Sequence, residues 1–145
     1  MRWRAVADER GSAVSEFIVV AVLVLIPIAY GVISIVRVQS ASFASAQAVR
    51  EAGRAFMTSD AVVQANVRAQ SAARLALADH GFTLPDGALR IDCHGGSCLS
   101  PGSAATVTLH WTVDLPWFPA GFGQIAAMPI SATHRVPVDA YRITS

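Results

Sequence analysis

The chain has 145 residues, of which 53% are hydrophobic and only 14% are charged. Its 11 basic residues, all arginine, nearly balance its 10 acidic residues, so the formal net charge is +1. This balance excludes the large basic face that nucleic-acid binding needs, and we expect no nucleic-acid partner. The part that follows residue 36 is long enough for one small domain and too short for two.

Residues 1–11 are polar and are followed directly by a long apolar run, so they are predicted to be a leader rather than a fold element. Arginines lie on both sides of the apolar run: Arg2, Arg4 and Arg10 before it, and Arg37, Arg50 and Arg54 after it. The two counts are tied. The clustering of the first three next to a very short tail favours a cytoplasmic N-terminus and an extracytoplasmic C-terminal domain.

The segment from Phe17 to Val36 contains no charged residue. At the rise of an α-helix it is roughly 30 Å long, which matches the hydrocarbon core of a bilayer. A helix that is apolar on every side does not belong on the surface of a small soluble domain. The segment therefore predicts a single transmembrane helix, within which Pro27 is tolerated.

Glu16 stands immediately before this apolar run. A carboxylate at a membrane boundary is costly unless it has a positively charged partner. If the chain were cut after Gly11, Ser12 would carry a new α-amino group, which is mostly protonated at neutral pH. Ser12 and Glu16 are one helical turn apart, and the pair can also form between neighbouring subunits. An ammonium and a carboxylate about 4 Å apart attract by about 4 kcal/mol at an effective dielectric constant of 20.

These residues carry a resemblance. A short leader that ends in Gly11, a small residue at Ser12, Glu16 and Phe17 at the fifth and sixth positions after it, and then a long apolar helix resemble a type IV prepilin-type signal. The segment Ala48–Phe56, which reads AVREAGRAF, is similar to the AAREGAR-like segment of the TadE/TadG-like minor pseudopilins of tight-adherence pili. The specific resemblance covers residues 1–57.

The resemblance implies a function. The chain would be a precursor that a prepilin peptidase cuts between Gly11 and Ser12, and then a structural or assembly subunit of a pilus. Glu16 would pair with an N-terminal amine and set the helix register between subunits, with Phe17 beside it. The implied partners are the peptidase, other pilus subunits, the pilus assembly platform and the membrane. Neither a cofactor nor a small-molecule substrate is expected.

Helical periodicity continues beyond the apolar run. Alanines recur at spacings of three and four from Ala41 to Ala55, with bulkier Val38, Phe43, Val49 and Phe56 between them. We expect one continuous helix from about Ser15 to Phe56, whose second half packs on the domain. The predicted divisions are a leader (1–11), this helix (12–57) and an exported α+β domain (58–145).

A second helix is predicted from about Ala61 to Asp79, after a turn and cap at Thr58–Asp60. His80-Gly81 is a helix stop, in which Gly81 takes the left-handed conformation. The apolar face of this helix is expected to consist of alanines and five larger residues: Val62, Val63, Val67, Leu75 and Leu77.

The remainder predicts strands at Ala88–Cys93, Thr106–Leu115 and Pro129–Val138. In the second of these, apolar residues from Val107 to Leu115 alternate with polar ones, as in an antiparallel sheet with one buried face. The fold class is therefore α+β: the long helix, a second helix and a small antiparallel sheet of about three to four strands, as in pilins.

Cys93 and Cys98 form a closely spaced pair in a segment that we place outside the cytoplasm, so they are expected to form a disulfide. A zinc site is the alternative, with His94 as a third ligand, but no fourth ligand is placed by the sequence. We expect no metal.

The loop after the second strand is rich in proline, glycine and aromatic residues. Trp117, Phe118 and Phe122 either form a surface that binds a partner or fold under the sheet and close its core.

No phosphate-binding loop, nucleophile elbow or triad spacing is present in the sequence, and we do not expect an enzyme. Two rival hypotheses remain. The chain could be a single-pass membrane protein whose exported domain binds a ligand or partner, in which case Gly11 and Glu16 would be dispensable. Alternatively, it could be secreted after cleavage at the small-residue pattern Ala44–Ala46.

Overall fold

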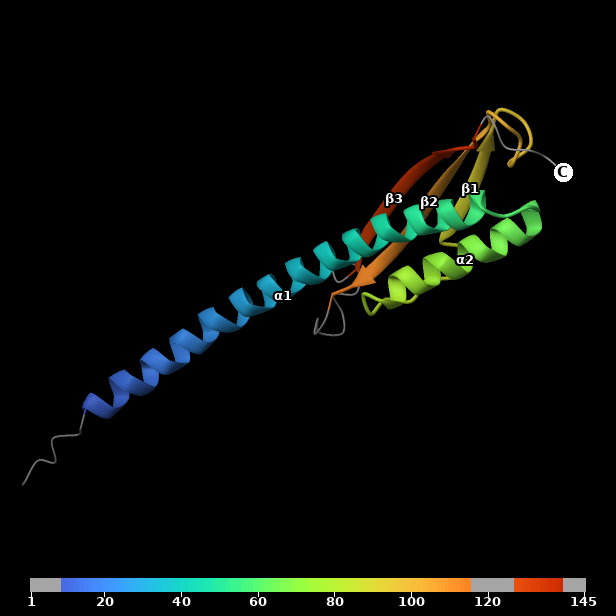
Figure 1. Cartoon of the computed structure of the whole chain (residues 1–145). Helices are drawn as coiled ribbons and strands as arrows, with labels where there is room; N and C mark the ends of the chain where they lie inside the picture. The colour runs from blue at the N-terminus through green and yellow to red at the C-terminus, as the bar shows by residue number, and fades with distance from the viewer. Residues whose placement is uncertain (1–8, 116–126, 140–145) are drawn as a thin grey trace, which may run out of the picture. The chain divides into compact units, whose positions relative to one another are not determined.

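The computed structural model describes residues 9–115 and 127–139, with residues 9–12 described by their backbone alone (Figure 1). Two helices precede three strands: α1 (Glu9–Met57), α2 (Val62–Ala78), β1 (Leu89–His94), β2 (Ala104–Asp114) and β3 (Ala127–Pro137). The predicted α+β fold with a small antiparallel sheet is thus confirmed, with three strands in the described residues.

The α1 helix is continuous, as predicted. It begins six residues before the predicted start at Ser15 and ends one residue after Phe56. The chain divides between Val36 and Arg37 into two units. In the first unit the large apolar side chains of α1 are exposed, and Pro27 lies inside the helix.

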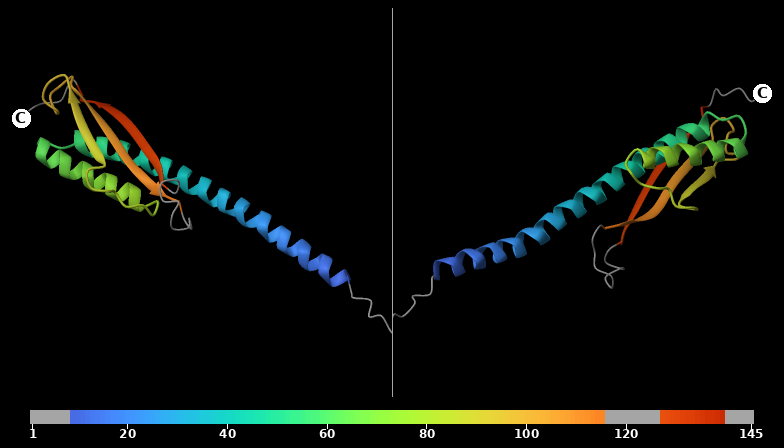
Figure 2. Two further views of the ribbon diagram at one scale, coloured as in Figure 1. Left: turned by 180° about the vertical axis from the view of Figure 1, so that it is seen from behind. Right: turned by 90° about the horizontal axis from the view of Figure 1, so that it is seen from below.

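In the second unit, the part of α1 from Arg37 onward and α2 lie side by side on one face of the sheet (Figures 1 and 2). The sheet order is β1-β2-β3, and both pairs of neighbours are antiparallel. Leu109 in the central strand pairs with Leu89 on one side and Ala132 on the other. Val107, Leu109 and Val113 are buried, as the alternation in β2 predicts.

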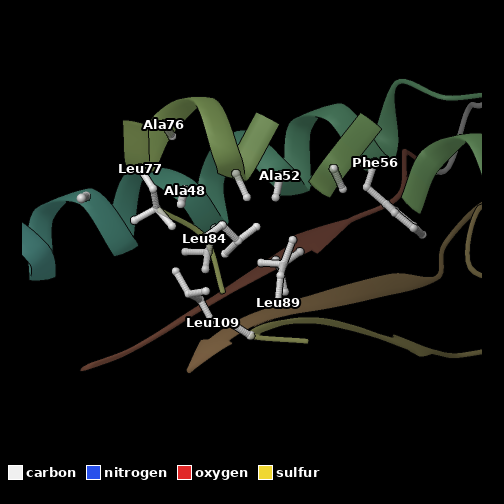
Figure 3. Close-up of a cluster of buried hydrophobic side chains, with 14 of the residues drawn as sticks. Ala48, Ala52, Phe56, Ala76, Leu77, Leu84, Leu89 and Leu109 are labelled. Atoms are coloured by element: carbon white, nitrogen blue, oxygen red, sulfur yellow. The ribbon is translucent and has the colours of Figure 1, made fainter. Parts of the chain in front are cut away.

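One hydrophobic core joins the helices to the sheet. Alanines from both helices, together with a few large side chains, occupy the space between the layers (Figure 3). The labelled members are Ala48, Ala52, Phe56, Ala76, Leu77, Leu84, Leu89 and Leu109. The second half of α1 is therefore a core element of this unit as well as a continuation of the apolar segment.

The predicted apolar face of α2 is wrong for four of its five large residues. Val62, Val63, Val67 and Leu75 are 38%, 80%, 62% and 66% exposed, and only Leu77 is buried. The buried face consists of four alanines and one leucine: Ala65, Ala69, Ala73, Ala76 and Leu77. Small side chains let two helices lie close together. The narrow space between them accommodates alanine, and the larger residues face outward. Phe43 on α1 is also exposed, contrary to its expected packing role.

The turn between the helices also differs from the prediction. The N-cap of α2 is Ala61, which offers no side-chain cap, so Asp60 does not serve as one. The hydroxyl groups of Thr58 and Ser59 instead donate to carbonyl oxygens of the last turn of α1. At the other end of α2, Gly81 has a φ of 76°, which confirms the predicted glycine stop.

Candidate functional site

The processing site predicted from the sequence lies at the start of α1. Because α1 begins at Glu9, the Gly11–Ser12 bond is in its first turn. The N–H groups of a first turn have no intrahelical acceptors, and helix ends fray at little cost. The backbone around this bond can therefore open without unfolding of the rest of the helix. Ser12 and Glu16 lie one turn apart, which corresponds to a rise of about 6 Å.

Glu16 and Phe17 both project from the helix. Phe17 is 73% exposed, and Glu16 is exposed and forms no ion pair with another described residue. The helix that follows is long and apolar enough to cross a membrane, and its most apolar window is not buried by any described part of the chain. A carboxylate at the edge of such a surface is open to an amine from its own or a neighbouring chain.

Arg37 is the first charged residue after the apolar segment, and the domain holds it in place. Its guanidinium carbon lies 5.3 Å from the centre of the Phe82 ring, and its Nε donates to the Asp114 carbonyl oxygen at 3.1 Å. Phe82 in turn meets Trp111 edge to face, with ring centres 5.2 Å apart. Stacking on Phe82 stabilises the cation by about 0.5–1 kcal/mol. Arg37, the first residue of α1 in this unit, thus contacts both the segment that follows α2 and the end of β2.

A second polar link ties α1 to the sheet. The Trp111 indole N–H donates to the Ser45 hydroxyl at 2.9 Å, and that hydroxyl donates to the Ala41 carbonyl oxygen at 2.7 Å. Ser45 is completely buried in a row of alanines. A hydroxyl group at this position satisfies a donor that the apolar core would otherwise leave unpaired.

We expect Ser45→Ala to destabilise the full-length protein by about 1–3 kcal/mol, because it leaves the Trp111 N–H without its acceptor. Urea unfolding in detergent, followed by near-UV circular dichroism, measures the change. The control is Trp111→Phe, which removes the donor. In that background Ser45→Ala should have almost no further effect, and equal costs in both backgrounds would contradict this role for the hydrogen bond.

The predicted disulfide between Cys93 and Cys98 is confirmed. It joins the end of β1 to the following loop, where Gly95 and Gly96 have φ angles of 86° and 121°. Both cysteines pack against the hydrophobic core. Within residues 9–115 and 127–139, no three His, Cys, Asp or Glu side chains are grouped in a way that could hold a metal ion. Trp117, Phe118 and Phe122, predicted as a partner surface or core lid, lie outside the described residues.

No family model, curated protein or solved structure matches this chain. The structure nevertheless identifies residues whose roles the sequence did not reveal. Arg37 was noted only as a charge and Ser45 only as part of a cleavage pattern, yet both connect α1 to the sheet. For Ser45, the available signal was a hydroxyl group in register with a row of alanines. For Arg37, it was its position directly after the apolar run.

Proposed function

We propose that this chain is a TadE/TadG-like minor pseudopilin, a structural or assembly subunit of a tight-adherence pilus. A prepilin peptidase cuts the precursor between Gly11 and Ser12 on the cytoplasmic side of the membrane. The apolar half of α1 then anchors the subunit, and the extracytoplasmic α+β domain meets other pilus subunits or the assembly platform. Glu16 pairs with an N-terminal amine and sets the register between subunits.

The observation that carries this proposal is the double role of α1. One uninterrupted helix supplies an exposed apolar segment up to Val36 and a row of core residues from Ala41 to Phe56. A membrane anchor with no further role needs only a linker between its span and the domain. A helix that serves both as the membrane span and as part of the domain core suits a subunit whose helix packs against other subunits while its domain faces outward. The exposed Glu16 at the start of the apolar surface adds the pilin-like charge.

The helix also argues against the secreted alternative. Cleavage after Ala46 would cut α1 inside the domain core. It would remove Ala41, Ala44 and Ser45, all of which are completely buried, and with Ser45 the acceptor for Trp111. Losses of this kind cost several kcal/mol in a domain whose total stability is about 5–15 kcal/mol.

Intact mass measurement of the protein from membranes tests the proposal. With the cognate prepilin peptidase present, we expect a chain that begins at Ser12, with or without a methyl group on its amine. Without the peptidase we expect a chain that begins at Met1. Gly11→Leu should block the cut because it places a side chain at the cleaved bond. Ser12→Ala is the matched control, since it keeps a small residue and should leave processing intact.

The other outcomes are equally informative. A chain that begins at Gln47 would indicate secretion after a signal peptide. An intact Met1, in cells where the same peptidase cuts another substrate, would refute the pseudopilin proposal and leave a membrane-anchored binding domain.

A further inference from the structure

Within the described part of the chain, the outer edge of β3 is open along most of its length. Val138 donates its backbone N–H to the Ser103 carbonyl oxygen at 2.8 Å, directly beyond the Ala104–Pro137 pair. Antiparallel partners alternate between hydrogen-bonded and non-hydrogen-bonded pairs. Even-numbered β3 residues therefore bond to β2, and odd-numbered ones direct their backbone groups away from the sheet. No other described strand pairs with that edge.

Two prolines bracket the open edge. Pro129 and Pro137 both fall on odd positions, where a missing N–H costs no bond to β2. Between them, Ser131, Thr133 and Arg135 present three N–H donors, with the accompanying carbonyl groups, to whatever lies beyond. The free backbone groups between the two prolines can pair with one extended segment, and the prolines end the pairing on either side.

The opposite edge of the sheet is different. His110 donates its N–H to the Ala88 carbonyl oxygen, so even-numbered residues of β1 bond to β2 and odd-numbered ones face outward. The outward carbonyl group of Leu89 is met by the side-chain amide of Gln70 on α2, at 3.5 Å. The second helix thus caps one end of the β1 edge, whereas no such side chain reaches Ser131–Arg135 from the described part of the chain.

A groove runs along the β3 edge. Its volume is about 280 Å³, and its walls are the second half of α1 and the middle of β3. The lining residues are Ser42, Ala46, Val49, Arg50, Ser131, Ala132, Thr133 and His134. The α1 wall is made of small or apolar side chains apart from one charge. Arg50 is exposed and forms no ion pair with another described residue, and none of the described residues that line the groove is acidic.

We propose that the groove between α1 and β3 binds an extended peptide segment that carries a carboxylate side chain, which adds to the sheet beside β3. The backbone of the segment bonds to Ser131, Thr133 and Arg135. Side chains of the added strand alternate between two faces, so those on the helix side meet Ala46 and Val49 and place a glutamate or aspartate against Arg50. A charge-assisted contact of this kind is about twice as strong as a neutral one. The proposal concerns an interaction surface and stands whether or not the leader is cut.

A synthetic peptide tests this directly. The probe is acetylated, amidated and fluorescently labelled Thr-Val-Thr-Glu-Thr-Val-Thr, titrated with the full-length protein in detergent micelles and followed by fluorescence anisotropy. A second peptide has lysine in place of glutamate. We expect the glutamate peptide to bind at least about tenfold more tightly than the lysine peptide. Bound peptide should also slow amide hydrogen exchange at Ser131, Thr133 and Arg135.

Two variants locate the site independently. Thr133→Pro removes the central outward donor at a position equivalent to the natural prolines, and Arg50→Glu reverses the charge in the groove. Each should weaken binding of the glutamate peptide at least about tenfold. Arg68→Glu is the matched control, because Arg68 is exposed on α2, outside the groove, and should leave the affinity unchanged. Circular dichroism of each variant verifies folding, and Arg50→Glu remains decisive if Thr133→Pro does not fold.

Three results would overturn the proposal. The first is no binding of either peptide to the wild type at about 1 mM. The second is equal binding of the glutamate and lysine peptides. The third is a concentration-dependent dimer of the protein that Thr133→Pro abolishes, which would identify the occupant of the edge as a second copy of this chain.

Discussion

Gly53→Leu is expected to lower the free energy of unfolding of the domain by about 2 kcal/mol. A Cβ atom at Gly53 would lie 2.6 Å from Cγ2 of Val136 on β3, and that methyl group belongs to a stiff, branched side chain. Forcing extra carbon atoms into this contact costs about 3 kcal/mol. The better helix propensity of leucine returns about 1 kcal/mol of that. In thermal unfolding of the full chain in detergent, the midpoint should fall by about 10 °C.

Gly31→Leu is the matched control for this prediction. Gly31 is another glycine of α1, and a Cβ placed there has no neighbour within 4 Å. The same substitution should therefore leave the unfolding midpoint of the domain unchanged. Equal midpoints for Gly53→Leu and the wild type would mean that α1 and β3 do not approach as closely as the structure has them.

Much of the fold could be predicted from sequence patterns that do not depend on which residues lie close together in space. The apolar run and the helical spacing of alanines from Ala41 together predict the long helix, and the alternation from Val107 to Val113 predicts a strand; the structure contains both elements. The pairing of Cys93 with Cys98 was also predictable, because they are the only two cysteines in the sequence and lie five residues apart. These signals are local, so a single sequence is sufficient to detect them.

The wrong predictions concern residues whose burial depends on how much space lies between neighbouring elements. Hydrophobicity alone ranks Val63, Val67 and Leu75 above alanine for burial, yet the face of α2 that is covered has room mainly for alanine. Similarly, the helical pattern gives no sign that the missing side chain of Gly53 makes room for Val136. Close approach between distant segments leaves no trace in periodicity, because both a loosely packed and a tightly packed helix repeat every 3.6 residues.

Some residues of the candidate sites could likewise be predicted from the sequence, and others could not. Gly11, Ser12 and Glu16 could be selected from their order and from the apolar run that follows. The groove beside β3 could not, because it requires the strand order, the parity of the hydrogen bonds and the position of Arg50 on α1 together. Pro129 and Pro137 were a local hint, since proline within a sheet is found mainly on edge strands.

Glu16→Gln is expected to leave processing intact and to weaken assembly at least about tenfold. In the proposed function the cut depends on the residue at Gly11, so the mature chain should still begin at Ser12. The carboxylate, however, attracts a terminal amine about 4 Å away by about 4 kcal/mol at an effective dielectric constant of 20. Losing even a third of this attraction weakens association about tenfold. The amount of the protein that crosslinks to pilus subunits in membranes should fall by at least that factor.

Glu51→Gln provides the matched control, because it makes the same chemical change on the same helix, beyond the apolar segment. It should leave crosslinking unchanged, and Glu16→Asp should retain most of it because the charge is kept. If Glu16→Gln crosslinks as well as the wild type while Gly11→Leu abolishes both processing and crosslinking, the new amine matters but its partner is not Glu16. If neither substitution reduces crosslinking, the domain alone makes the contact, and the apolar half of α1 acts only as an anchor.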